Sequence, residues 1–178
     1  MADPSVLARL RDGVAAWNAW REGVELAEVD LRGADLRELD LRGADLWYAL
    51  LQGARLDGAL LSGAILDRAD LGRAELSHAV FYRTRLRGAL LDGCRLRGAT
   101  FVESDLTLAK ITESDLTGAV FTGATLDGAN FFGSNVDEAH GLPEAGRWIV
   151  DEDGVPRRAI HEGIDRRVVG RVSGGEGD

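Results

Sequence analysis

The sequence has few of the residues that mark disulfide-stapled, secreted or membrane-spanning chains. Cys94 is its one cysteine, so no intramolecular disulfide can form. No apolar run approaches the roughly 18 residues that a spanning helix needs, and residues 1–10 lack the basic and apolar segments of a secretion signal. We therefore expect a cytoplasmic protein without a membrane segment.

Residue patterns typical of enzymes and metal sites are also missing. The three histidines, His78, His140 and His161, have no carboxylate or cysteine at ligand spacing. Cys94 occupies a column of small residues, described below, in which a thiol behaves as a slightly larger alanine. We therefore predict a protein that is not an enzyme and needs no cofactor or metal.

The charge balance disfavours some partners. The chain has 30 acidic and 21 basic residues, a formal net charge of −9. Such a surplus disfavours direct binding to nucleic acid or to anionic membranes. It is compatible with a protein partner that itself binds DNA, although acidity for solubility alone is the stronger explanation.

A repeat of five residues dominates the rest of the sequence. Every fifth residue from Leu26 to Val136 is large and apolar, at 23 positions without a slip. Two residues before each lies a small or apolar residue, Ala in 15 cases, and two residues after each lies Gly in 12. A helix would show spacings of three and four, and a flat strand a spacing of two. The pattern predicts short extended pieces, with two residues inward, joined by frequent corners.

The repeat resembles the A-(D/N)-L-x-x signature of the pentapeptide-repeat family, which is visible as Ala-Asp-Leu at 34–36 and 44–46. The resemblance covers residues 24 to about 139. It implies an all-β fold, a right-handed quadrilateral parallel β-helix with four pentapeptides per coil. The solenoid would then have nearly six coils and a length of roughly 28 Å.

Glycine suits the corners because it tolerates left-handed backbone angles. The same slot is also occupied by Glu28, Arg68, His78 and Glu113. We therefore predict that not every corner requires such angles.

The two ends should cover the open edges of the β-helix. Residues 1–23 are predicted as a helical cap, with one helix over 4–22 begun by Asp3 and Pro4. Its apolar stripe should lie on the first coil of the repeat domain, residues 24–140. That stripe consists of Leu7, Leu10, Val14 and Trp17.

The C-terminal part is predicted as a small cap over 141–172 and a disordered tail over 173–178. Within the cap, Arg147–Val150 and Val155–Ile160 could form a hairpin around a turn at 151–154. A short helix is the alternative. This segment could also form a homodimer seam.

One face of the predicted solenoid is neutral and apolar. Residues twenty apart stack in such a coil, so the outward residues can be sorted by face. This neutral face is a candidate interface, or the place where the segment 141–172 docks. It consists of Leu60, Val80, Tyr82, Val102 and Val120.

The other faces carry the acidic candidates: Asp35, Asp45, Asp57, Asp67, Glu75, Asp105, Asp115 and Asp127. The resemblance implies two functions. The favoured one is a rigid protein–protein interaction scaffold. The alternative is a DNA mimic that binds DNA gyrase or topoisomerase IV and protects them from poisons, giving antibiotic resistance. A basic belt weighs against the alternative: Arg83, Arg85, Arg87, Arg95 and Arg97.

Overall fold

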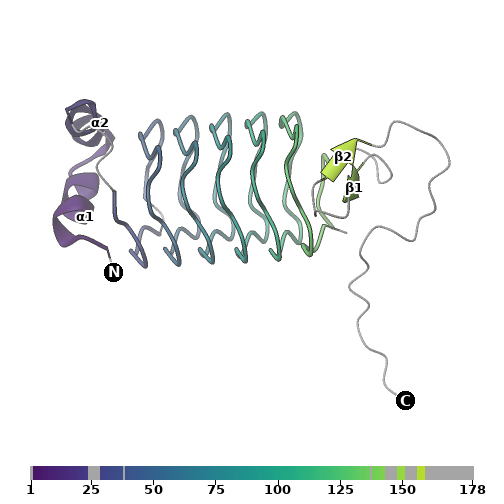
Figure 1. Ribbon diagram of the computed structural model, residues 1–178. Coiled ribbons are helices and arrows are strands. Elements are labelled where there is room, and N and C mark those ends of the chain that lie inside the picture. Colours follow the sequence, from purple (N-terminus) through teal and green to yellow (C-terminus); the bar gives the residue numbers. More distant parts are fainter. Residues whose placement is uncertain are drawn as a thin grey trace, which may run out of the picture.

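The computed structural model describes residues 2–23, 29–37, 39–136, 138–142, 148–150 and 156–158. Two helices, α1 (Pro4–Arg11) and α2 (Val14–Glu22), precede a stack of coils, and two short strands, β1 (Trp148–Val150) and β2 (Pro156–Arg158), follow it (Figure 1). Neither described helix has the length and apolarity needed to cross a membrane.

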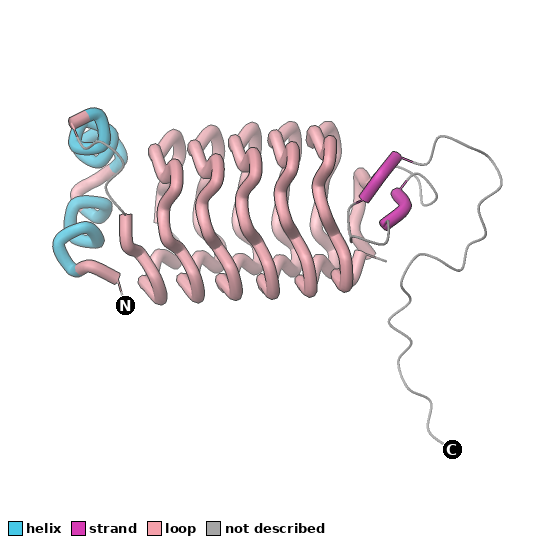
Figure 2. The backbone as a smooth tube through the Cα atoms, in the orientation of Figure 1, coloured by secondary structure: helices cyan, strands magenta, loops and turns pink. Residues whose placement is uncertain are grey.

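The coils are held together by parallel β-bridges between residues twenty apart. They run from Asp30↔Leu50 to Val120↔His140. Each bridge is isolated because a corner every five residues leaves one residue per side in position to pair. The coils are therefore drawn as loops, without extended strands (Figure 2). A solenoid of stacked coils with four pentapeptides per coil, as predicted, is confirmed.

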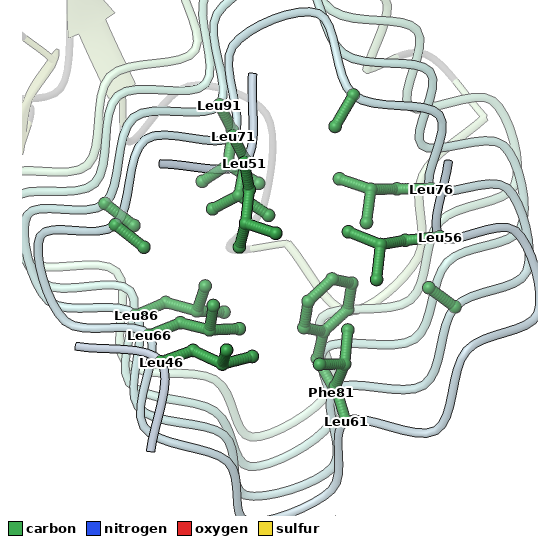
Figure 3. Close-up of a cluster of buried hydrophobic side chains, with 14 of the residues drawn as sticks. Leu46, Leu51, Leu56, Leu61, Leu66, Leu71, Leu76, Phe81, Leu86 and Leu91 are labelled. Carbon is green, nitrogen blue, oxygen red and sulfur yellow. The ribbon is translucent and has the colours of Figure 1, made fainter. Parts of the chain in front are cut away.

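The core consists of four columns of large side chains that point toward the axis (Figure 3). Leu46, Leu51 and Leu56 are completely buried, and so are their successors one coil further on. In one column Phe81, Phe101 and Phe121 stack with ring centroids 4.6 and 4.9 Å apart. Since burying one such side chain is worth about 1.5–3 kcal/mol, these columns supply most of the stability.

The corners contradict one prediction. A typical corner is closed by a hydrogen bond from a backbone N–H to the carbonyl three residues earlier, as from Ala34 to Leu31 at 3.0 Å. The residue before the donor has positive φ, as in a type II turn. Arg68, His78 and Glu113 have φ of 57°, 60° and 52° there. The prediction that not every corner requires left-handed angles was wrong for these three residues, because the turn imposes this angle on them. Glu28 lies outside the described residues.

The N-terminal region also differs from its prediction. Residues 4–22 form two helices, α1 and α2, because Gly13 between them has φ 108°, which is outside the helical range. Asp3 begins α1 as predicted, accepting a hydrogen bond from the Ser5 N–H at 2.8 Å. The break changes the phase of the stripe: Val6, Leu10 and Trp17 are buried, whereas the predicted Leu7 and Val14 are partly exposed.

The predicted C-terminal hairpin is confirmed in the part that the structure describes. β1 and β2 are antiparallel, with Trp148 opposite Arg158 and Val150 opposite Pro156. The predictions for the remainder of 141–172 and for 173–178 lie outside the described residues.

Candidate interaction surfaces

The structure places the five residues of the neutral face on one side of the solenoid. Leu60 and Val80 are directly bridged, and Thr100 links Val80 to Val120. Tyr82 and Val102 form the neighbouring row, since the Arg83 N–H bonds to the carbonyl of Val102 one coil further on. Leu60 and Tyr82 are both 37% exposed, and the three valines are half-buried. The result is a mainly aliphatic strip beside the Phe column, with Thr100 and Tyr82 within it.

The charged groups around the neutral face neutralise one another. Arg42 bonds to both carboxylate oxygens of Asp40, with the shorter contact at 2.5 Å. Arg83 pairs with Glu103 at 2.6 Å, and its guanidinium lies 4.9 Å from the centre of the Tyr82 ring. A partner that covers this strip therefore meets no uncompensated charge from these four groups, which lowers the cost of desolvation.

The acidic candidates are mostly paired with arginine. Six of the eight lie within salt-bridge distance of a guanidinium, and the two others, Asp57 and Asp127, form no ion pair with any described residue. Arg37, two positions after Asp35, holds the pKa of Asp35 at about 2 through side-chain hydrogen bonds. Every arginine of the basic belt takes part. The pairs are Asp35–Arg37, Asp45–Arg21, Asp67–Arg85, Glu75–Arg95, Asp105–Arg87 and Asp115–Arg97, and Arg83 pairs with Glu103.

The net charge of the solenoid lies at its C-terminal end. Residues 29–110 contain 12 acidic and 12 basic residues, whereas residues 111–142 contain five acidic and no basic residue. Most of the solenoid is therefore a mosaic of compensated charges and does not present a continuous negative surface.

A second apolar surface was missed in the sequence. It lies along a corner of the coils, and we call it the aromatic edge. Sorting by face separates a corner residue from the first outward residue of the next face, although the two are only two positions apart in the chain, as Tyr48 and Leu50 are. Reading those two columns together would have found it. Leu108 is 67% exposed and three others are 37–40% exposed. The aromatic edge consists of Trp47, Tyr48, Leu50, Leu90 and Leu108.

Comparison with known families agrees with this geometry. The family model described as pentapeptide repeats, in eight copies, matches residues 25–63, 48–81, 79–118 and 105–137. These matches extend over more than half of the chain. The chain belongs to the pentapeptide repeat family.

Several solved pentapeptide repeat proteins are similar. HetL from Nostoc sp. strain PCC 7120, which is involved in heterocyst differentiation regulation, is 31% identical over 66% of each chain, with a TM-score of 0.50. A thylakoid-lumen protein of Arabidopsis thaliana is 31% identical, covering 61% of this chain and 65% of its own, with a TM-score of 0.35. QnrB1, a plasmid-mediated fluoroquinolone resistance protein, is 21% identical, covering 68% and 76%, with a TM-score of 0.31.

The matched part spans slightly less than two thirds of the length of HetL and of the Arabidopsis protein. No match was found among curated protein sequences.

The interior of this pentapeptide repeat protein holds its few polar side chains in internal hydrogen bonds. Cys94 is buried and its thiol donates to the carbonyl of Leu71 at 3.0 Å. Burial raises the pKa of this thiol to about 12. Ser114 likewise donates to Leu91 at 2.7 Å. Among the described residues no three His, Cys, Asp or Glu side chains gather to hold a metal ion.

Proposed function

We propose that the protein is a non-enzymatic scaffold: a rigid solenoid that binds a partner protein through the neutral face. The observation that carries this proposal is the combination found on that face. Leu60, Val80 and Val120 form an aliphatic row, and the flanking charges of Arg42 and Arg83 are already paired with carboxylates. Such a surface favours a protein partner over nucleic acid, whose binding depends on uncompensated cations.

The stiffness of the solenoid supports this role. Backbone groups along the sides are paired with the coils on either side: the Leu60 N–H donates to Leu39 of the preceding coil at 3.0 Å, and the Leu61 N–H donates to Val80 of the following coil at 2.8 Å. Little ordering is then required on binding, so less affinity is lost to entropy.

Further features of the fold and its location belong to the same proposal. We infer a right-handed solenoid of nearly six coils, closed by the helices at one end and by residues 141–172 at the other, in the cytoplasm. The side-chain hydrogen bonds from α2 to the first described coil support the N-terminal part, including Trp17 Nε1 to Asp45 O at 2.8 Å. The alternative for residues 141–172 is that they join two copies of the chain in a homodimer.

The alternative, a DNA mimic acting on gyrase or topoisomerase IV, is favoured by the five acidic residues of 111–142, a stretch without Lys or Arg. It is weakened by the arginine partners of Asp35, Asp67, Glu75 and their neighbours, which cancel the field that a polyanion mimic needs. A supercoiling assay with and without a quinolone distinguishes the two. Inhibition or protection at roughly micromolar protein, an affinity worth about 8 kcal/mol, would favour the mimic.

The neutral face is tested by photo-crosslinking in cells from position 82, which is 37% exposed, in the otherwise unchanged chain and in the double variant Val80→Glu with Val120→Glu. We expect an adduct of defined mass that the double variant no longer forms, with unchanged unfolding. The matched control, Ser77→Glu with Thr125→Glu, adds the same charge to two other sides and should retain the adduct. An adduct unaffected by the neutral-face variant, or no adduct at all, would refute the proposal.

A further inference from the structure

The aromatic edge begins at a pair of contacting rings. Trp47 and Tyr48 meet edge to face with their centroids 4.5 Å apart. The backbone of Trp47 is fixed on both sides, because its N–H donates to Asp45 at 3.1 Å and its carbonyl accepts from the buried Arg21 at 3.0 Å. Exposed aromatic rings that are already ordered make strong anchors for a protein partner, since little entropy is lost when they are covered.

The uncompensated charge beside these rings is positive. Arg68 stacks one coil along from Tyr48, with its guanidinium 5.6 Å from the ring centre and donating to the Tyr48 hydroxyl. It is exposed and forms no ion pair with any described residue. The nearby carboxylates are already bonded elsewhere: Asp67 to Arg85, Asp70 to Gln52, Asp92 to Lys110 and Asp105 to Arg87. A chain with a net charge of −9 thus offers an oriented free cation here.

The backbone along the aromatic edge is not available to a partner. Leu50 donates to Val29 at 2.9 Å and accepts from Leu31 at 2.8 Å. Leu90 is paired in the same way, donating to Ala69 at 2.9 Å and accepting from Leu71 at 2.7 Å. A partner strand therefore cannot extend the sheet at this surface, and recognition has to use side chains.

The spacing of the apolar side chains fits a helix. Leu50 and Leu90 are two bridges apart through Asp70, which corresponds to about 9.6 Å at the usual distance between paired strands. In an α-helix, residues i and i+7 lie on one side at about 10.5 Å. An extended chain repeats on one side at roughly 6.6 and 13 Å, so it meets one of the two leucines and misses the other.

We propose that the aromatic edge docks an acidic amphipathic α-helix of a partner protein. Its apolar stripe covers Tyr48, Leu50, Leu90 and Leu108 over about three turns, and an Asp or Glu beside the stripe pairs with Arg68. This inference deepens the proposed scaffold function by naming a partner chemistry, but it concerns a surface separate from the neutral face.

The test uses the full chain and two synthetic amphipathic helical peptides that are identical except that one carries Glu and the other Lys beside the leucine stripe. Binding is followed in NMR spectra by the indole N–H signal of Trp47, assigned with Trp47→Phe. We expect the Glu peptide to shift this signal saturably and the Lys peptide to bind roughly tenfold more weakly, because a charge-assisted hydrogen bond is replaced by repulsion. Arg68→Glu should reverse the preference.

Two further variants make the result decisive. Leu90→Ser with Leu108→Ser removes exposed side chains and should abolish the shift with the unfolding transition retained. Val80→Glu with Val120→Glu should leave it unchanged, so failure of the neutral face and failure of the aromatic edge are distinguished. An unshifted Trp47 signal, or equal binding of both peptides that survives Arg68→Glu, would overturn the proposal.

Discussion

The carboxamide of Asn18 satisfies the backbone of Asp45 as a neighbouring coil would. Its Oδ1 accepts from the Asp45 N–H at 2.9 Å, and its Nδ2 donates to the carbonyl of Gly43 at 2.9 Å. The carbonyl of Asp45 accepts from the indole of Trp17 at 2.8 Å. Side chains of α2 thus supply both kinds of partner to an edge whose unpaired groups would otherwise invite association with other chains.

Asn18→Ala should therefore destabilise the solenoid from its N-terminal end. It leaves the Asp45 N–H and the Gly43 carbonyl without their partner, at a cost of about 1–3 kcal/mol. Urea denaturation followed by circular dichroism measures the loss. Arg42→Ala, which breaks an exposed ion pair, is the control and should cost less than about 1 kcal/mol. Equal effects of the two variants would show that Asn18 is a surface residue only.

The left-handed corners predict a reciprocal pair of substitutions. Gly118 has φ 69° and nothing within 4 Å of an added Cβ, so Gly118→Ala acts through the backbone angle alone. We expect it to destabilise by about 1 kcal/mol. Leu108 has φ 59° and is mostly exposed, so Leu108→Gly should stabilise, although the greater entropy of unfolded glycine reduces the gain. Thermal melting of both variants checks the signs, and two changes of the same sign would contradict this account.

Two buried serines should respond differently to the same change. The hydroxyl of Ser114 accepts from the Cys94 N–H at 3.0 Å as well as donating to Leu91. The hydroxyl of Ser104 donates to Phe81, but the Ser104 N–H and the Phe81 carbonyl have further backbone partners. Ser114→Ala strands a buried N–H and should cost at least about 1 kcal/mol more than Ser104→Ala. Equal unfolding free energies of the two variants would show that, without the Ser114 hydroxyl, the Cys94 N–H forms the usual turn hydrogen bond to the carbonyl of Leu91.

The sequence was sufficient for the repeat but not for its corners. Leu46, Leu51 and Leu56 were identified as inward because burial acts on every fifth residue alike, and their complete burial agrees. Whether Arg68 or Glu113 has positive φ depends on the turn that the stacked coils impose, and composition does not reveal it. The helix break at Gly13 was missed because the apolar stripe continues across it in the sequence.

The surfaces were less predictable than the core. The neutral face followed from counting in steps of twenty. The pairing of Asp67 with Arg85 and of Asp105 with Arg87 depends on side-chain directions across coils, eighteen positions apart, which the count does not give. For the same reason the corner residues Tyr48 and Leu108 were not connected with Leu90 on the adjoining face.

The Asp–Arg pairs of the first coils should make stability depend on acidity. Hydrogen bonds from the Arg42 side chain hold the pKa of Asp40 at about 2, below the usual 3.8. Because the folded pKa is the lower one, the stabilisation is present above about pH 3.8 and is lost as the pH falls toward 2. Asp30 and Asp35 behave alike through Arg32 and Arg37.

NMR titration of the Asp40 carboxyl carbon and urea midpoints between neutral pH and pH 2 measure this effect. Arg42→Gln should return the pKa of Asp40 toward 3.8 and flatten its share of the pH dependence. Salt at roughly 1 M, where the Debye length is about 3 Å, should weaken the shift because the pairs are exposed. A wild-type Asp40 that titrates at its usual pKa would show that Arg42 does not hold the carboxylate in solution.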